Sequence, residues 1–216
     1  MLIENSPKAI VTIMKAAQIN NYGGDEVIEI HNTAIPVCSD NTMLVQVYAA
    51  GINPSDWKIR EGYFKKNMPI KFPATLGGDF SGVVTEVGEG VSAFKKGDDV
   101  YGQASFLKNG SGSFAEFVKT ETGTVNHKPL NISYLQAAAL PLAGASAWQA
   151  LVEHMGISGE KKIIIHGGAG GIGSIAIQIA KYFGAYVATT VRSENMEYVR
   201  NLGADETRDS GDTRQP

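Results

Sequence analysis

The chain has 216 residues, of which 43% are hydrophobic and 19% charged, and its formal net charge is −3 at pH 7. This composition is typical of a globular protein with a sizeable core, long enough for one large domain or two small ones. No basic block stands out, which argues against nucleic acid as a partner. The single cysteine, Cys38, excludes an intrachain disulfide and a multi-cysteine zinc site.

The N-terminal sequence carries no sign of targeting. Residues 1–13 indicate a loose leader, and Met14 is a second plausible start of translation. Glu4 and the shortness of the apolar runs are unlike a signal peptide. No run reaches the ~18 apolar residues of a membrane span. We therefore expect a cytoplasmic protein that does not enter a membrane.

Residues 14–128 have a mainly β pattern. Residues 43–49 (MLVQVYA) alternate apolar and polar side chains, and residues 81–87 and 97–101 indicate further short strands. Glycine-rich turns separate these segments. Several short strands with glycine turns and no helical period predict a small barrel-like β domain.

Helical signals begin near Pro129. Ser133 is a candidate N-cap for a helix over residues 134–140, which Pro141 ends or kinks. A second helix is expected over residues 145–154. Both precede the segment that carries the strongest functional signal.

That segment is strand, glycine turn and helix in succession. Residues 163–165 are an apolar run, a glycine-rich turn follows, and residues 175–183 are amphipathic. Residues 186–191 indicate the next strand and residues 194–202 the next helix. This β-α-β-α order predicts parallel strands joined by helical crossovers, so residues 129–205 are expected to form the N-terminal half of a Rossmann domain.

The glycine turn has the spacing of a dinucleotide-binding loop. Gly168, Gly170 and Gly173 satisfy G-x-G-x-x-G, and Gly167 begins an overlapping set. Without Cβ atoms a pyrophosphate can approach the backbone amides, and the helix N-terminus supplies partial positive charge. The flanking strand and helix are the context that the motif requires.

The last eleven residues, 206–216, are ETRDSGDTRQP. They are polar throughout, whereas a parallel sheet is expected to continue with an apolar third strand. We therefore predict an irregular tail, a sheet that stops after two strands, and weak or absent NADPH binding by this 216-residue chain.

Six stretches, the glycine turn among them, resemble the zinc-free quinone oxidoreductase (zeta-crystallin-like) branch of the medium-chain dehydrogenase/reductase superfamily. They are residues 49–62 (AAGINPSDWKIREG), 72–88 (FPATLGGDFSGVVTEVG), 94–102 (FKKGDDVYG), 112–118 (GSFAEFV), 137–151 (AAALPLAGASAWQAL) and 163–181 (IIIHGGAGGIGSIAIQIAK). The resemblance covers about residues 15–205. It implies an α/β protein with a GroES-like β domain and a Rossmann domain, here incomplete. It also implies NADPH-dependent reduction of quinones or enones in the cleft between the domains.

The resemblance also bears on metal binding. Zinc-dependent relatives have a cysteine where this chain has Asn53, and a His-Glu pair where it has Gly78-Asp79. Catalytic zinc needs three protein ligands of the Cys, His or carboxylate type, and Asn53 and Gly78 cannot serve. We expect no metal.

Three residues are candidates for the chemistry itself. By resemblance, Asn53 is the leading polar group near the substrate, where charge builds on oxygen during reduction. Lys58 is a more speculative proton donor, and Tyr63 is the nearest tyrosine in the stretch. The alternative for Asn53 is equally plausible, because Asn-Pro is a turn dipeptide. Asp56 and Asp79 are expected to anchor loops by accepting backbone N–H bonds.

The cofactor choice depends on the end of the second nucleotide-domain strand. An NAD site usually has an acid about 20 residues beyond the glycine turn, and none precedes Glu194. Thr190, Arg192 and Ser193 can instead bind a 2′-phosphate, so NADPH is expected. The alternative is that Arg192 is a solvated side chain and Ser193 a helix cap.

By resemblance, Ser146 lies near the nicotinamide and Lys181 near the adenosine phosphate, although each is explained as well by ordinary helix packing or exposure. The expected nucleotide-binding residues are Ser146, Gly167, Gly168, Gly170, Gly171, Ile172, Gly173, Lys181, Thr190, Arg192 and Ser193.

The function predicted is zinc-independent hydride transfer from NADPH to a small quinone or α,β-unsaturated carbonyl. A homodimer is the oligomeric state that the resemblance implies. The alternative is a truncated, inactive fragment or a non-catalytic binding module.

Overall fold

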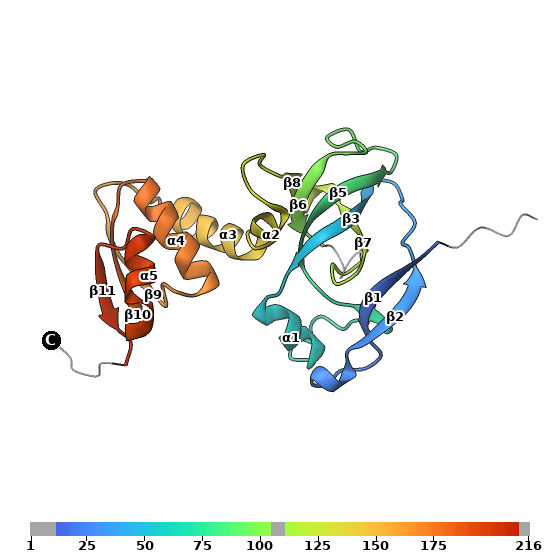
Figure 1. Ribbon diagram of the computed structural model, residues 1–216, viewed down its shortest axis with the longest axis horizontal. Coiled ribbons are helices and arrows are strands. Elements are labelled where there is room, and N and C mark those ends of the chain that lie inside the picture. The colour runs from blue at the N-terminus through green and yellow to red at the C-terminus, as the bar shows by residue number, and fades with distance from the viewer. Residues whose placement is uncertain (1–11, 105–110, 212–216) are drawn as a thin grey trace, which may run out of the picture. The chain divides into compact units, whose positions relative to one another are not determined.

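The computed structural model describes residues 12–104 and 111–211 of the chain. These residues fall into two compact units, an N-terminal unit up to Pro141 and a C-terminal unit from Leu142 (Figure 1). Most of the expected leader, residues 1–11, lies outside the described residues, and Ile13 already begins the first strand. No helix in the described part of the chain is long and apolar enough to cross a membrane.

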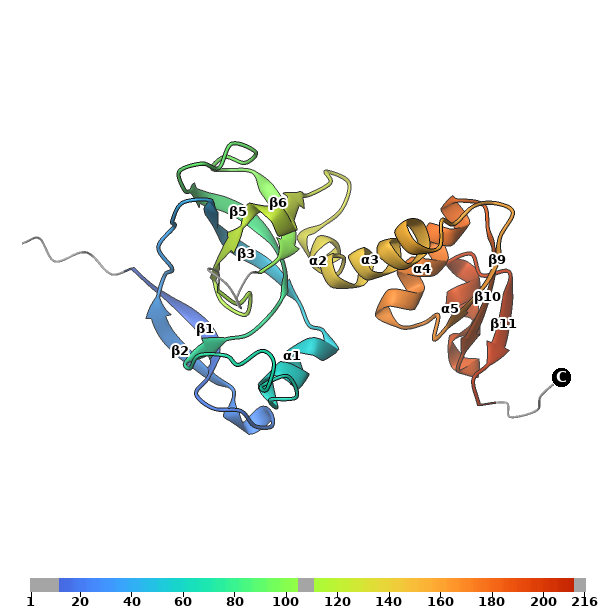
Figure 2. The same cartoon turned by 180° about the vertical axis from the view of Figure 1, so that it is seen from behind.

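The N-terminal unit is built on two β-sheets. The larger has five antiparallel strands in the order β7-β3-β5-β6-β8, and Figure 2 labels β3, β5 and β6 at its centre. The smaller has the order β2-β1-β4. The strands are β1 (Ile13–Ile19), β2 (Glu29–Ala34), β3 (Thr42–Gly51), β4 (Ala74–Thr75), β5 (Asp79–Val87), β6 (Asp99–Gln103), β7 (Phe117–Glu121) and β8 (Val125–His127).

The centre of the larger sheet follows the alternation seen in the sequence. Along β3, Val45 and Val47 turn toward the core while Gln46 and Tyr48 are exposed, as period-2 geometry requires. The core of this sheet consists of Met43, Val45, Phe80, Val84, Phe94, Val100, Val118 and Val125. The expectation of a β domain is confirmed.

Two short helices and two 3₁₀ turns accompany these sheets. Helix α1 (Pro54–Arg60) follows β3, with Asn53 as its N-cap and Pro54 at the first helical position, where proline is favoured. Helix α2 (Tyr134–Ala138) begins at Ser133, which forms a capping box with Gln136. The cap expected at Ser133 is therefore confirmed. The 3₁₀ turns are η1 (Asp25–Val27) and η2 (Thr122–Thr124).

The boundary between the units lies later than the expected position at residues 128–129. Helix α2 packs on β3 and β5 and so belongs to the N-terminal unit. The Tyr134 ring stacks on Tyr48 at 4.7 Å between centroids, and its hydroxyl donates to Asp99 Oδ1 at 2.6 Å. Composition changes where helices begin, but contacts with the sheet decide to which unit a helix belongs.

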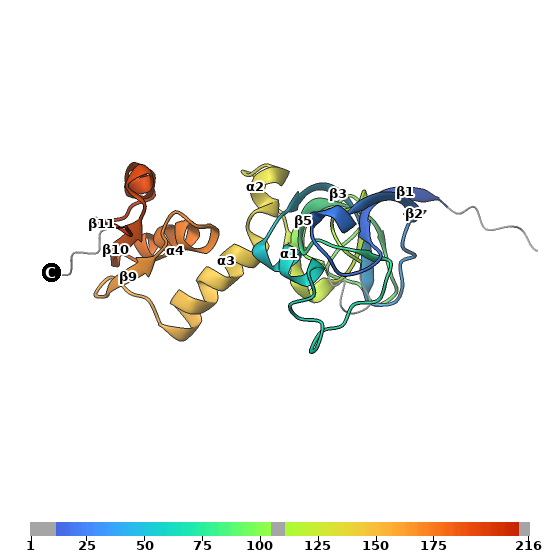
Figure 3. The same ribbon diagram turned by 90° about the horizontal axis from the view of Figure 1, so that it is seen from below.

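The C-terminal unit is a parallel sheet with helices. Strands β9 (Lys162–His166), β10 (Tyr186–Val191) and β11 (Glu206–Asp209) lie in the order β11-β10-β9. Helix α4 (Gly171–Tyr182) connects β9 to β10 and packs on both (Figure 3). The 3₁₀ turn η4 (Ser193–Asn195) and helix α5 (Met196–Asn201) connect β10 to β11. Ahead of β9 lie α3 (Pro141–Trp148) and the π-helical turn η3 (Gln149–His154).

The prediction that the sheet stops after two strands is wrong. Residues 206–209 of the expected irregular tail form the third strand, in register with β10 from Ala188 to Val191. A polar sequence suits this position because β11 is an edge strand of the described sheet, and charges on an edge oppose further pairing. The remainder of the tail, from residue 212, lies outside the described residues.

Candidate functional site

The glycine turn is held to the neighbouring strand by its first two amides. The N–H groups of Gly167 and Gly168 donate to the Thr190 carbonyl at 3.0 and 3.2 Å. Gly167 has φ +71°, a conformation that other L-residues rarely adopt. The turn is therefore fixed relative to the carboxyl end of β10.

Packing leaves no room for a Cβ at Gly168 or Gly173, but it leaves room for one at Gly171. A Cβ at Gly168 would overlap the Thr189 hydroxyl, and one at Gly173 would overlap the Gly167 carbonyl. At Gly171, by contrast, the nearest atom to an added Cβ would be Ala143 Cβ at 3.9 Å, an ordinary contact. Packing within the described chain thus explains Gly168 and Gly173 but leaves open space at Gly171.

The turn leads directly into a helix N-terminus. Gly170 is the N-cap of α4 and forms no side-chain cap, and Gly170, Gly171 and Ile172 are exposed. The first N–H groups of a helix have no partner within it, and they carry the positive end of the helix dipole. With open space at Gly171, this arrangement is suited to a phosphate group.

The carboxyl ends of the three strands meet at the same edge as this turn. The Thr190 hydroxyl lies 3.3 Å from the Gly167 amide nitrogen and 3.2 Å from His166 Nδ1, so it supports the turn itself. Arg192 follows β10 with its side chain 81% exposed, and its only ion pair in the described chain is a 4.0 Å contact with Glu194. Its guanidinium is therefore accessible to an anion.

Ser193 has a contact that the sequence reasoning missed. Its hydroxyl donates a short hydrogen bond to Asp209 Oδ2 at the end of β11, and the other oxygen of Asp209 accepts from the Gly211 amide at 2.9 Å. Asp209 was missed because residues 206–209 were not expected to form a strand, which would have placed an acid at this edge.

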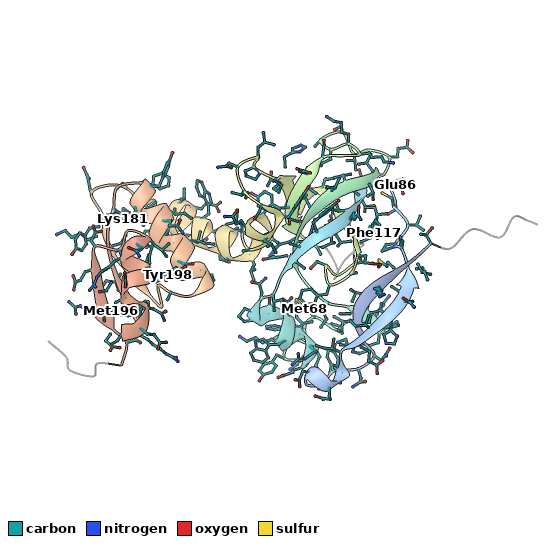
Figure 4. The ribbon with its side chains drawn as sticks, viewed as in Figure 1. Met68, Glu86, Phe117, Lys181, Met196 and Tyr198 are labelled. Carbon is teal, nitrogen blue, oxygen red and sulfur yellow. The ribbon has the colours of Figure 1, made fainter. Side chains whose placement is uncertain are left out.

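Two of the expected nucleotide-binding residues do not lie at the turn. Lys181 is in the last turn of α4, where its ammonium binds Asp205 at 2.8 Å and the Ala185 carbonyl at 3.1 Å (Figure 4). Lys181 is ten residues beyond Gly171, which places it about 15 Å from the start of α4. The Ser146 hydroxyl donates to the Leu142 carbonyl within α3 at 2.7 Å. These contacts give both residues a role in the fold.

In the N-terminal unit, Asn53 is held between two buried carboxylates. Its Nδ2 donates to Asp79 Oδ2 at 2.9 Å, and its backbone N–H donates to Asp56 Oδ2 at 2.7 Å. Gln103 Nε2 donates to the second oxygen of Asp79 at 3.3 Å. Asp56 and Asp79 are 6% and 1% exposed. Asp56 anchors backbone as expected, whereas these bonds to Asp79 come from side-chain amides.

This environment raises the pKa of the Asp56 carboxyl. Burial raises the pKa of its carboxyl above the usual 3.8, and the nearby Asp79 carboxylate raises it further, while backbone N–H bonds from Asn53 and Gly78 act in the opposite direction. Within residues 12–104 and 111–211, no three His, Cys, Asp or Glu side chains are grouped so as to hold a metal ion.

Asn53 also borders an apolar cavity of about 280 Å³ within the N-terminal unit. Trp57 of α1 lines the same cavity and is 39% exposed. Lys58 and Tyr63 contact Trp57 rather than the cavity: the Lys58 ammonium lies 5.6 Å from the indole centroid and the Tyr63 ring packs edge-on at 5.4 Å. The structure thus brings Asn53 and Trp57 to one cavity.

Known proteins resemble this chain over nearly its whole length. The alcohol dehydrogenase GroES-like domain family matches residues 39–130. The chloroplast envelope quinone oxidoreductase homolog of Arabidopsis thaliana is 40% identical over 204 residues, covering 91% of this chain and 61% of that protein. The structure of the quinone oxidoreductase from Coxiella burnetii superposes with a TM-score of 0.82 at 37% identity, covering 92% of this chain and 62% of that one.

The chain belongs to the quinone oxidoreductase family of medium-chain dehydrogenases/reductases. Another relative, the NADPH-dependent alkenal/one oxidoreductase of Arabidopsis thaliana chloroplasts, is 41% identical over 200 residues, covering 89% of this chain and 51% of that protein. The chain thus spans about half to three-fifths of the length of these family members. Its fold class, a GroES-like β domain with a partial Rossmann sheet, is confirmed.

Proposed function

We propose that this protein is a zinc-independent, NADP(H)-dependent oxidoreductase that reduces a quinone or an α,β-unsaturated carbonyl. The observation that carries the proposal is the glycine turn before α4, with open space at Gly171 that packing within the described chain does not require. When bound, NADPH supplies the hydride. The chain's residues bind the nucleotide, orient the substrate and polarise the substrate oxygen that gains charge.

The residues at the carboxyl edge of the parallel sheet fit the adenosine side of NADPH. The N–H groups at the start of α4 face the pyrophosphate, and Arg192 pairs with the 2′-phosphate. Asp209 ends β11 and accepts from Ser193 and Gly211, whereas the acid that binds a ribose 2′-hydroxyl in NAD sites lies about 20 residues beyond the glycine turn, where this chain has none before Glu194. With β11 in place, the first β-α-β-α-β half of the nucleotide fold is present.

At the reacting end, Asn53 is the polar group we propose beside the substrate. One N–H of its carboxamide is bound to Asp79, and Nδ2 carries a second N–H that can donate to a substrate oxygen as it gains charge. Asp79 acts as a positioning residue because its carboxylate fixes which end of the amide is presented. Lys58 and Tyr63 remain candidates for supplying the proton.

The substrate class is suggested by the names of two relatives, a quinone oxidoreductase homolog and an alkenal/one oxidoreductase. Both relatives are chloroplast proteins by name, so the cytoplasmic location of this chain remains a prediction. The homodimeric state is likewise a prediction. The second candidate function is a non-catalytic nucleotide-binding module, for which the glycine turn before α4 would suffice.

The cofactor proposal is tested by titrating the chain calorimetrically with NADPH and NADH, which differ only in the 2′-phosphate. We expect NADPH to be preferred over NADH. Arg192→Gln should lower affinity for NADPH about tenfold and leave NADH unchanged, since one charge-assisted pair is lost. Gly171→Ala should weaken both nucleotides while melting as the wild type does. Equal binding of NADPH by all three proteins would refute the site.

The reaction is tested by following NADPH oxidation with a naphthoquinone and with an enone of similar size. Turnover that falls in Asn53→Ala, with nucleotide affinity unchanged, supports the assignment of Asn53. Nucleotide binding without oxidation of either substrate would favour the non-catalytic alternative.

A further inference from the structure

The hydroxyl of Ser193 is held by an acid from the neighbouring strand. Ser193 is exposed and lies just after β10, and its hydroxyl donates a short hydrogen bond to Asp209 Oδ2 at the end of β11. A serine hydroxyl carries a single proton. While that proton points to Asp209, the Ser193 oxygen presents only lone pairs to other groups, and these repel the oxygens of a phosphate.

The backbone around Asp209 fixes its carboxylate in place. The second carboxylate oxygen accepts from the Gly211 amide at 2.9 Å. The Ser210 amide donates to the Val191 carbonyl at 2.8 Å, which continues the pairing of Asp209 with Val191. Asp209 is also half-buried. A ligand that needs the Ser193 proton must therefore compete with an acceptor that is already in position.

The same edge of the sheet carries the cation proposed for the 2′-phosphate. Arg192 directly precedes Ser193, and its side chain is 81% exposed. Neighbouring residues are about 3.8 Å apart at Cα, so a phosphate paired with Arg192 comes close to the Ser193–Asp209 pair. Like charges within the Debye length, about 8 Å at physiological ionic strength, repel each other. Asp209 thus opposes the phosphate that Arg192 attracts.

We propose that Asp209 is a specificity-determining residue that lowers the preference of this chain for NADPH over NADH. It holds the Ser193 proton and places a negative charge beside the position of the 2′-phosphate. NADH has an uncharged hydroxyl there, which can both donate and accept, so Asp209 does not oppose it. This inference rests on the proposed function, because it requires the 2′-phosphate to bind at Arg192.

Asp209→Asn reverses the hydrogen bond and keeps the size of the side chain. The asparagine oxygen can still accept from the Gly211 amide, and Nδ2 then donates to the Ser193 oxygen. The Ser193 proton is released and can turn toward a phosphate. Glu206→Gln is the matched control: it removes a charge from the same strand, three residues and about 10 Å from Asp209 at ~3.3 Å per residue.

Binding is measured by calorimetry with two pairs of probes that differ only in the 2′-phosphate: NADPH with NADH, and adenosine 2′,5′-bisphosphate with 5′-AMP. We expect Asp209→Asn to tighten binding of both phosphorylated probes about tenfold, since one charge-assisted contact is gained and one repulsion is lost. NADH and 5′-AMP should change by less than about twofold. Glu206→Gln should change the affinity for all four probes by less than about twofold, because its charge is about a Debye length away.

Ser193→Ala separates the effect of the proton from that of the charge. In the wild type it should leave the affinity for NADPH unchanged, because Asp209 already holds the proton. In the Asp209→Asn background it should lower that affinity by at least about threefold, because the released hydroxyl is lost. The difference between the two backgrounds is the coupling that a double-mutant cycle measures. A residue that only supports the fold would not produce this coupling.

Four results would overturn the proposal: no gain for the phosphorylated probes in Asp209→Asn, an equal gain for NADH and 5′-AMP, an equal gain in Glu206→Gln, or equal effects of Ser193→Ala in both backgrounds. A gain for the bisphosphate in Asp209→Asn without NADPH oxidation by any variant would contradict the proposed reductase and leave this inference standing. Oxidation of NADPH by the wild type with no gain in Asp209→Asn would do the reverse.

Discussion

At the residue scale, Lys181 could bind a phosphate, but its ammonium instead binds the Asp205 carboxylate. The Lys181 ammonium first, and the Val187 backbone N–H next, hold the pKa of Asp205 below its usual 3.8. A carboxyl whose pKa is lower in the folded than in the unfolded chain stabilises the fold at neutral pH. That contribution is lost as the pH falls through the folded-state pKa.

We therefore predict that Lys181→Met lowers the free energy of unfolding by about 1 kcal/mol at pH 7, as for a partly exposed pair. The difference from the wild type should shrink below pH ~4 as Asp205 protonates. Urea unfolding across this pH range measures it, with Lys96→Met as an exposed lysine control. A deficit that is constant down to pH 3 would contradict the role of the pair.

Asn53 offers a second test at this scale, because it donates hydrogen bonds to the buried carboxyls of Asp56 and Asp79. Asn53→Asp adds a third carboxyl beside Asp56 and Asp79, and like charges raise the pKa of a carboxyl in the fold. A raised folded-state pKa stabilises the protein at low pH and ceases to do so as the pH rises through it.

Asn53→Asp should therefore be less stable than Asn53→Ala by about 2 kcal/mol at pH 7, with the gap closing toward pH 4. Thermal melts at several pH values would show this. An aspartate variant as stable at pH 7 as the alanine variant would mean that the carboxyls do not repel one another there.

At the scale of elements, β11 is a strand made of polar residues. Its side chains are held by contacts that suit an edge: Arg208 pairs with Glu206 at 2.9 Å, and Arg200 donates to the Thr207 hydroxyl at 2.7 Å. The Asp205 amide donates to the Val187 carbonyl at 2.8 Å. Since strand amides alternate in direction, the Thr207 amide also faces β10 and the Arg208 amide faces away.

Thr207→Pro should accordingly destabilise the C-terminal unit by at least about 1 kcal/mol, the net worth of one hydrogen bond. Arg208→Pro is the matched control and should change stability by less than about 0.5 kcal/mol, as for an ordinary surface substitution. Hydrogen exchange of β10 amides reports the difference. Similar effects of the two prolines would argue against the observed register.

At the scale of the whole molecule, each unit has a core of its own. Phe80 lies in the core of the larger antiparallel sheet, and Ile177 lies in the core of the parallel sheet. Both side chains are fully buried. A compact unit with its own core can unfold as a unit.

Phe80→Ala should cost about 3–5 kcal/mol and Ile177→Ala about 2–5 kcal/mol, each through a cavity. We expect hydrogen exchange to rise mainly in the N-terminal unit for the first variant and in the C-terminal unit for the second. Equal loss of protection in both units from either substitution would mean that they unfold together.

The sequence by itself determined the features that neighbouring residues control. The alternation along β3, the N-cap at Ser133 and the strand–turn–helix around Gly168 and Gly173 follow from side-chain period, capping and the absence of Cβ atoms. Each of these depends on residues within a few positions of one another, so each was predicted correctly.

Only the tertiary structure decided the features that join distant segments. The bond from Asn53 to Asp79, the cavity that Ala17 shares with Phe114, and the pair of Lys181 with Asp205 join residues whose proximity no local pattern encodes. The same reason explains β11. Residues 206–209 have no apolar pattern of their own and become a strand because β10 presents unpaired backbone groups beside them.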